Sequence, residues 1–428
     1  MNTIPTLSQR NRLANELHAR PFPVIDGAGQ VAFVALMPEP GQSREPAAER
    51  AHLLDLLDTY GATHPQPGAT HYFGTIGRHQ LKWESHSEFV TFTLISHQRP
   101  DPDRAFDPKL FDALSAEWLA KGPYVRVTSA LIDIHHELAA DDLVQHLGQW
   151  FVHESLAISD VLDQSATIAG DFRIDDAGHM RFAISVAQGT GPARTGRILQ
   201  RICEIETYKA MAMLGLFAAK EAGTELSKLD DELAQITRSL NAPDMDAEQV
   251  LGKLMAVSSR LEALEAETSY RFGATAAYER IVHQRIDVLR EARFGGRQTF
   301  AEFMMRRFDP AMRTVASVTQ RIAAATKRAG RAAELLRTQV EVARSAQNQA
   351  LLQSMDQRAD AALRLQQTVE GLSVVAISYY AISIAGYLLY PFAGPLGISR
   401  GWMMAGLTLP IVGLVWLAVR RIRRRFHP

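Results

Sequence analysis

The last 58 residues of the chain carry no acidic side chain, and their few charges leave two long uncharged stretches, residues 371–399 and 401–419. Only Arg400 separates the two stretches. About 20 helical residues match the ~30 Å hydrocarbon core of a bilayer, so each stretch is long enough to cross a membrane. The pattern predicts a first transmembrane helix at 371–390, a short outer loop at 391–400 and a second transmembrane helix at 401–419.

The remaining charges of this segment are five arginines crowded behind the second stretch: Arg420, Arg421, Arg423, Arg424 and Arg425. Basic residues flank transmembrane helices on the cytoplasmic side, so residues 420–428 are expected to form a basic cytosolic tail. Two crossings return the chain to the side it came from, which places the N-terminus in the cytosol as well. We therefore expect a two-span protein of the bacterial inner membrane, with the lipid bilayer as a partner.

The composition of the rest of the chain agrees with a cytosolic location. Cys203 is the only cysteine among 428 residues, which excludes an intramolecular disulfide and is typical of a reducing compartment. The formal net charge is -1, so the composition does not indicate nucleic acid as a partner.

Before Gly189, short runs rich in Val, Ile, Phe, Tyr and Thr alternate with helical patterns. Strands are expected at residues 31–37, 72–76, 89–95, 124–134, 168–174 and 180–187, and helices at residues 45–60, 108–120 and 141–151. Residues 170–187 are expected to form a β-hairpin around Asp175, Asp176 and Gly178. Interleaved strands and helices predict a cytosolic domain of the α/β or α+β class over residues 1–190.

After Gly189 the sequence is helical. Residues 191–309 are expected to form helices that pack on a long stalk helix at 310–370. The apolar positions of the stalk recur at intervals of three and four, which is typical of a helix with one packed face, as in a coiled coil. Such a rod cannot bury its apolar stripe alone, so we expect it to pack on the preceding helices and on other copies in a homo-oligomer.

Histidines are concentrated in the N-terminal domain, and one cluster there is a candidate metal site. His135 and His136 lie at a strand end, shortly before Asp141 and Asp142. Their spacing matches no known ligand motif, and neither Gly-x-Ser-x-Gly nor a phosphate-binding loop with a Lys-Ser/Thr pair occurs. No cofactor is expected from the sequence, and no enzyme activity.

A second candidate site is a dense run of functional side chains, Lys82, Glu84, His86 and Glu88. On a single strand continuing through Val90, alternate side chains share a face, so these four would point the same way. The resulting face could bind a cation or an anionic head group. It could equally be a solvated or ion-paired surface.

The first uncharged stretch also carries hydroxyl groups, at Ser378, Tyr379, Tyr380 and Ser383. Such groups could line a water-filled path if several copies surrounded an axis. In the alternative interpretation, the serines bond carbonyls of their own helix and the tyrosines pack between helices.

Three motifs together carry a resemblance: NELHARPF at 15–22, KWESHSEF at 82–89 and EGLSVVAISYY at 370–380. By these motifs the chain is identified as a member of an uncharacterised bacterial family described as predicted membrane-anchored proteins, a domain of unknown function. The resemblance spans nearly the whole chain. It implies membrane anchoring near the C-terminus, and it assigns no chemistry to any residue.

The order of elements is also similar to that of CorA-type magnesium channels, which have a cytosolic α/β domain, a long helix and two C-terminal spans. Those channels carry Gly-Met-Asn after the first span, where this chain has YLLYPFAG at 387–394. Arg400 is the only charge of the predicted outer loop, and it would repel Mg²⁺.

Two function classes follow from the sequence. The first is an oligomeric, cytosol-facing scaffold or regulatory and binding protein, whose α/β domain binds a ligand or a cytosolic protein partner. The alternative is a CorA-like cation channel or transporter without the usual selectivity motif.

Overall fold

The computed structural model describes residue 10 and residues 22–39, 41–101, 104–136, 138–240, 246–393 and 399–426, without the side chains of 140, 392–393 and 423–426. The chain divides into two compact units. The first comprises residues 1–245 and 252–332, and the second comprises residues 246–251 and 333–428.

A mixed sheet of nine strands organises the first unit, in the order β2-β3-β4-β1-β5-β8-β7-β6-β9. The strands are β1 (Gly29–Met37), β2 (His71–Ile76), β3 (His79–Ser85), β4 (Val90–Ser96), β5 (Val125–His136), β6 (Ala157–Val161), β7 (Ala166–Gly170), β8 (Met180–Val186) and β9 (Ala292–Arg293). β5 and β8 pair in parallel, and the other paired strands are antiparallel. The mixed sheet confirms the N-terminal combination of strands and helices.

The prediction of one strand through residues 82–94 was wrong, because β3 ends at Ser85 and the chain turns back into β4 at Val90. The turn contains no glycine, proline or asparagine that would have marked it in the sequence. It is held instead by distant side chains, which are described below. The strand expected at 168–174 ends at Gly170.

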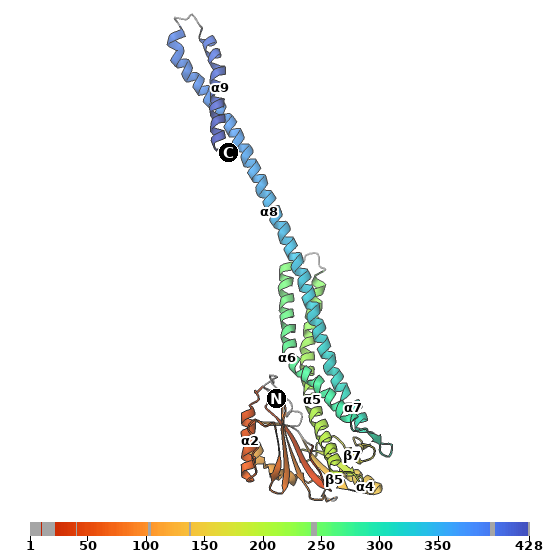
Figure 1. The fold of residues 1–428 in the computed structure, drawn as a ribbon. Coiled ribbons are helices and arrows are strands. Elements are labelled where there is room, and N and C mark those ends of the chain that lie inside the picture. Colours follow the sequence, from red (N-terminus) through yellow and green to blue (C-terminus); the bar gives the residue numbers. More distant parts are fainter. Residues whose placement is uncertain are drawn as a thin grey trace, which may run out of the picture. The chain divides into compact units, whose positions relative to one another are not determined.

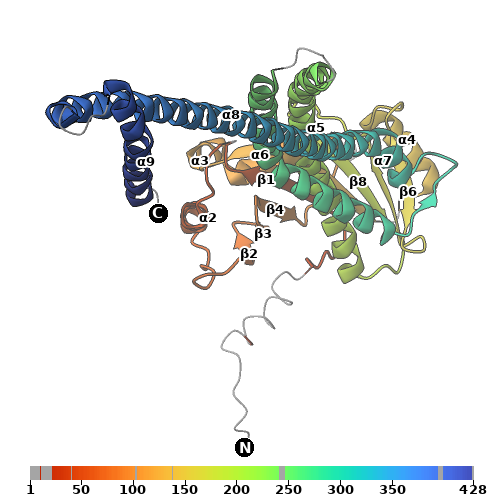
Figure 2. The same ribbon diagram turned by 90° about the horizontal axis from the view of Figure 1, so that it is seen from above.

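Side chains alternate between the two faces along every strand, so both faces of the sheet carry apolar residues. Helices cover each of these faces. One core contains Ala32 and Val34 together with residues of α2 (Pro46–Thr59), the 3₁₀ helix η2 (Pro108–Leu114), α3 (Ala116–Lys121) and α4 (Ala140–Trp150). The opposite core contains Val31 and Phe33 with residues of α5 (Pro192–Ser239), α6 (Ala247–Asp287) and α7 (Phe300–Arg307). Figure 2 shows α5, α6 and α7 over this second face.

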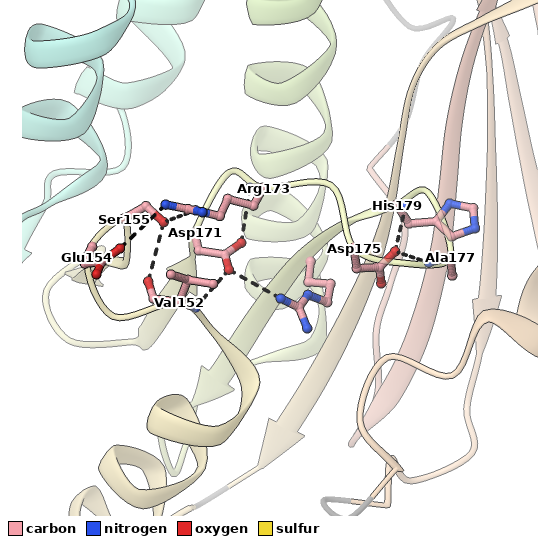
Figure 3. Close-up of polar contacts among 9 residues, drawn as sticks. Val152, Glu154, Ser155, Asp171, Arg173, Asp175, Ala177 and His179 are labelled. Carbon is pink, nitrogen blue, oxygen red and sulfur yellow. Dashed lines mark hydrogen bonds and ion pairs between the residues drawn. The ribbon is translucent and has the colours of Figure 1, made fainter.

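The connection between β7 and β8 forms the expected hairpin, with Gly170 opposite Phe182 and Ala166 opposite Val186. Figure 3 shows the polar contacts of this connection. The buried carboxylate of Asp171 accepts hydrogen bonds from the backbone of Val152 at 3.0 Å and from Arg181 at 3.3 Å. Asp175 caps the turn by accepting from the backbone N–H of His179 at 2.9 Å.

The helical region after residue 190 returns to the sheet before the chain enters the long helix α8. β9 pairs with β6, and the backbone N–H of Ile158 donates to Gln298 at 2.9 Å. Phe300 and Met304 of α7 are then buried in the same core as Phe182. The helices that begin with α5 therefore share their hydrophobic core with the sheet.

Within the first unit, α5 and α6 pack closely together, and both contact the beginning of α8 (Asp309–Ala393). A Cβ at Gly215 of α5 would lie 2.1 Å from the hydroxyl oxygen of Thr275 in α6, so only glycine allows this approach. Asp230 of α5 pairs with Arg321 at 3.2 Å and with Arg328 at 2.6 Å. α5 is continuous from Pro192 to Ser239.

The second unit contains the rest of α8 and α9 (Arg400–Phe426). Among the described residues, two helices are long and apolar enough to cross a membrane, within 309–391 and 400–422. Figure 1 shows α9 beside the end of α8, and Gly386 lies against the side chain of Met404. The two predicted apolar helices are therefore present; residues 394–398 of the predicted loop lie outside the described residues.

Candidate functional site

The strand register places four polar residues together on the sheet face that α5 covers. Lys82 of β3 pairs with Thr93 of β4, and Glu84 pairs with Thr91. Thr93 lies in turn opposite Phe33 of β1, a residue of the core beneath α5. On this face, β3 and β4 therefore carry polar side chains, whereas the neighbouring β1 carries the apolar Phe33.

A pocket lies between this polar patch and the first turns of α5. Its walls are formed by β1, β3, β4, the turn between β3 and β4, and α5, and its lining residues are Pro23, Phe33, Lys82, Glu84, His86, Phe89, Thr91, Thr93, Leu199, Gln200, Cys203, Glu204, Thr207 and Tyr208. The cavity volume is only about 30 Å³, so the pocket is narrow.

A chain of polar contacts crosses the pocket from the sheet to the helix. The Lys82 ammonium lies 3.1 Å from Glu84 and donates a hydrogen bond of 2.8 Å to the side-chain oxygen of Gln200. Gln200 donates to Glu204 at 3.0 Å, and Glu204 pairs with Arg285 of α6. Lys82 is only 4% exposed and Glu84 8%, so this pair is buried.

Aromatic rings form another wall. His86 stacks on Phe89 with ring centroids 4.5 Å apart, and the edge of Tyr208 meets Phe89 at 5.9 Å. Tyr208 also stacks on Tyr278 of α6 at 5.5 Å. The pocket thus combines flat apolar surfaces with a buried ion pair, a combination found in small-molecule sites.

Three of the four residues of the predicted ligand face, Lys82, Glu84 and His86, line this pocket, and Glu88 does not. Glu88 accepts hydrogen bonds from Arg271 at 3.0 and 3.2 Å and from the hydroxyl of Tyr278 at 2.7 Å. Burial favours its neutral form, but the hydrogen bonds from Tyr270 and Tyr278 together with Arg271 outweigh burial and lower the pKa of Glu88. Glu88 therefore holds the turn on α6.

The same turn is held from its other side by Arg44. This guanidinium binds Glu49 of α2 at 2.5 and 2.7 Å, the hydroxyl of Ser85 at 2.5 Å and the carbonyl oxygens of His86 and Ser87. Because Glu49 is buried, the pair is a fixed anchor. Both anchors position the turn that carries His86 and Phe89 into the pocket.

Pro23 borders the pocket where the chain crosses the first turn of α5. A Cβ at Gly196 would lie 1.6 Å from the carbonyl oxygen of Pro23, so this crossing requires glycine. Of the motif at 15–22, only Phe22 belongs to the described residues. The end of this motif thus adjoins the pocket that the second motif lines.

The residues of α5 that complete the pocket were missed by the sequence analysis. Gln200, Glu204 and Tyr208 follow one another at intervals of four, as do Cys203 and Thr207, so they share one face of the helix. A polar stripe inside a core helix was the only signal that could have indicated them. Burial raises the pKa of the Cys203 thiol, which holds it in the unreactive protonated form.

The four candidate metal ligands are not gathered into a site. His135 stacks on Trp150 at 5.1 Å, and burial, with His146 and Arg99 nearby, lowers its pKa to about 4. His136 follows on the opposite face of β5, and Asp141 and Asp142 are exposed in the first turn of α4. Within the part of the chain that the structure describes, no group of three or more His, Cys, Asp or Glu side chains could hold a metal ion.

The hydroxyl residues of the first apolar helix differ in their surroundings. Ser378 is buried, whereas Tyr379 and Tyr380 are exposed and contact each other edge to face at 5.8 Å. The hydroxyl of Ser383 donates to the carbonyl of Tyr379 at 2.9 Å, as serines in apolar helices commonly do. In α9, Arg420 lies over the ring of Trp416 and Arg421 is exposed, while Arg423, Arg424 and Arg425 fall outside the described side chains.

These features define a mixed α/β protein with a narrow pocket over its sheet and two apolar helices at its C-terminal end. The chain belongs to the DUF3422 family, described as a protein of unknown function, which matches residues 6–426. The resemblance to an uncharacterised family is thereby confirmed. No curated protein and no solved structure matches the chain, so the resemblance to CorA-type channels gains no support.

Proposed function

We propose that the protein is a membrane-anchored, homo-oligomeric binding or regulatory protein, whose α/β domain faces the cytosol of a bacterial cell. The observation that carries this proposal is the exposure of the two apolar C-terminal helices. In their most apolar windows only 11% of the α8 residues and 0% of the α9 residues are buried. Helices this long and apolar need a hydrocarbon environment, and a bilayer supplies one.

The distribution of arginines supports a hairpin with its connection outside. Arg400 stands alone at the start of α9, and the five arginines from 420 to 425 follow at its other end. By the positive-inside bias, the tail and the α/β domain would both lie in the cytosol of the cell that carries this inner membrane.

The exposed apolar residues of α8 support self-association. Between residues 333 and 370, Leu335, Val342, Leu351, Leu352, Met355, Leu363 and Leu365 are each at least half exposed in the single chain. A solvent-exposed helix with this many large apolar side chains gains stability by packing on copies of itself in a coiled coil. A cytosolic protein partner could cover the same residues, and the oligomeric state distinguishes the two cases.

Topology and oligomeric state test the proposal. Full-length protein should remain in the membrane fraction after carbonate extraction. Green fluorescent protein fused to the C-terminus should fluoresce if this end lies in the cytosol. Alkaline phosphatase inserted at Gly397 should be active if the connection between the two helices lies outside. Light scattering coupled to size-exclusion chromatography should give the purified protein the mass of an oligomer, after the mass of the bound detergent is subtracted. Extraction by carbonate, a reversed fusion pattern or a monomer would contradict the proposal.

A CorA-like cation channel is the second candidate, and the order of the sheet domain, the long α8 and the short α9 favours it. The test is divalent-ion flux in liposomes. Flux that disappears in a Ser378→Ala or Ser383→Ala variant would favour the channel, and flux no greater than in empty liposomes would exclude it.

A further inference from the structure

One face of α8 keeps the same residue spacing before and after the start of its long uncharged stretch at Gly371. This face, the α8 seam, consists of ten residues at alternating steps of four and three: Leu351, Met355, Arg358, Ala362, Leu365, Val369, Leu372, Ala376, Tyr379 and Ser383. The seam up to Val369 precedes the uncharged stretch, and the rest lies within it. A repeat of 3.5 residues is typical of helices that wind around one another. The pattern therefore favours helix pairing along both parts of α8.

The α8 seam is uncovered in the single chain. Its large apolar residues are each more than half exposed: Leu351, Met355, Leu365, Val369, Leu372 and Tyr379. Between them, Ala362 and Ala376 are exposed, and Ser383 is half-buried. A row of large apolar side chains in this state gains stability when another surface covers it.

The second apolar helix of the same chain does not cover the seam, because α9 packs on the other side of α8. Figure 1 shows α9 beside the end of α8, where Gly386 lies against Met404. On that side Ser378 is only 4% exposed, and Val374, Ala381 and Ala385 are half-buried. Each residue of this row follows a seam residue by two positions, as Ser378 follows Ala376. Two positions correspond to a rotation of about 200° around an α-helix, so the two rows lie on opposite faces.

The extent of the seam decides what kind of partner fits it. A water-soluble protein reaches only the part before Gly371, because it cannot follow the seam into the hydrocarbon core of a bilayer. Lipid tails surround only the part after Gly371 and leave the other part in water. A helix that spans the membrane and continues into the cytosol reaches both parts. The α8 helix of a second copy does so with the same spacing of residues.

From these observations we infer that α8 of one copy packs against α8 of a second copy along the whole seam, in parallel and in register. Both copies insert with the same topology, so their α8 helices run in the same direction. The uncharged stretch begins at the same residue in each copy, which keeps the two helices level in the bilayer. Ala376 and Ser383 allow a close approach, as small residues commonly do between transmembrane helices. The inference rests on the proposed function, because it requires a membrane-anchored oligomer.

Arg358 is the charged residue within the seam. Parallel, in-register pairing brings Arg358 of both copies to the same level, where the two guanidinium groups repel each other. A charged residue at such a position lowers the stability of a coiled coil. Arg358→Leu should therefore strengthen the oligomer, which non-specific association of exposed residues does not predict.

Disulfide cross-linking of the full-length protein in membrane vesicles tests the inference. Ala376→Cys on the seam and Ser378→Cys on the α9 side lie in the same uncharged stretch, two positions apart. On oxidation with copper phenanthroline, Ala376→Cys and Leu365→Cys should give a covalent dimer and Ser378→Cys should not, because a disulfide requires Cα atoms within about 7 Å. Wild-type protein, with its buried Cys203, is the blank. A dimer with Leu365→Cys alone, or equal cross-linking of Ala376→Cys and Ser378→Cys, would overturn the inference.

Energy transfer between differently labelled copies in detergent micelles measures the strength of the same contact. Leu365→Asp should raise the dissociation constant at least about tenfold, because a buried leucine is lost from the seam. Leu363→Asp is the matched control, since this leucine is also exposed but lies on the opposite face, and it should change the dissociation constant little. Arg358→Leu should lower the dissociation constant. Equal effects of the two aspartate variants in a membrane-bound oligomer would remove the seam and leave the proposed function in place, whereas a monomeric wild type would contradict both.

Discussion

Glu88 in the turn between β3 and β4 accepts two hydrogen bonds from Arg271 of α6, although 183 positions separate the two residues in the sequence. This pair joins the turn that carries His86 and Phe89 to α6, which follows the 48-residue helix α5 in the sequence. The pocket wall therefore depends on the packing of α6.

The contribution of this pair can be measured with Glu88→Gln. The variant loses the charge that Arg271 and Tyr278 stabilise. At neutral pH we expect its free energy of unfolding to be about 1–3 kcal/mol lower than that of the wild type. Because the pKa of Glu88 is lowered in the folded protein, its charge stabilises the fold, and this stabilisation is lost as the pH falls through that pKa. The wild type and the variant should therefore differ less in unfolding free energy at acidic pH. Urea unfolding at neutral and acidic pH checks this, with Glu117→Gln as the exposed control. A difference that does not change with pH would contradict it.

Asp133 should give the opposite pH dependence. It is buried between β1 and β5, where it accepts hydrogen bonds from the backbone of Phe106 at 2.9 Å and from Gln30 at 3.4 Å, and burial raises its pKa to about 7. A carboxyl group with a raised pKa stabilises the fold in acid and loses this effect as the pH rises to about 7. Asp133→Asn should therefore be more stable than the wild type at pH ~8, by up to a few kcal/mol, and equally stable near pH ~4. Thermal midpoints at the two pH values test this, and a variant that is less stable at high pH would contradict it.

Cys203 should react slowly with maleimides in the folded protein. Only the thiolate reacts, and burial of Cys203 raises its pKa. We expect alkylation near pH 8 to be at least about tenfold slower in the native protein than in urea. Mass spectrometry gives the rate directly, because Cys203 is the only cysteine of the chain. Equal rates in the two states would mean that the packing of α5 on the sheet does not bury this side chain.

Gly215 should tolerate no larger side chain. In Gly215→Ala the new methyl group would overlap Thr275 of α6, and we expect a loss of about 1–3 kcal/mol of unfolding free energy. Adding Thr275→Ala should recover part of that loss, because it removes the hydroxyl oxygen and the methyl carbon and leaves only the Cβ in close contact.

Gly223 of the same helix provides the matched control for this prediction. A Cβ there would make an ordinary 3.7 Å contact with Val318, so Gly223→Ala should gain about 0.5–1 kcal/mol through helix propensity. If both alanine variants had the same stability, close packing of α5 on α6 would be contradicted.

The parts of the fold that were predictable depend on local chemistry. Strands such as β1 and β4 are rich in β-branched and aromatic residues, and α8 and α9 contain long stretches without charge. The period of two along β3 puts Lys82 and Glu84 on the same face of this strand, and both line the pocket. These signals act over a few residues, so a single sequence contains them.

The parts that were not predictable depend on distant partners. The turn at 86–89 contains no glycine, proline, asparagine or aspartate, and Arg44, Arg271 and Tyr278 hold it in place. Gln200 and Glu204 join Lys82 only because α5 crosses the edge of the sheet. β9 has only two residues, too few to give a strand pattern. No periodicity along the chain encodes such contacts.

The return of the chain to the sheet through β9 and α7 has a consequence for synthesis. β8 ends at Val186, but the core over Phe182 is complete only when Met312 has been made. At ~5–20 residues per second this takes roughly 6–25 s, during which the sheet face beneath α5, α6 and α7 is only partly covered. The first apolar helix then follows from residue 371, roughly 3–12 s later. The core of the first unit can therefore be completed before the first long apolar stretch of the chain has been synthesised.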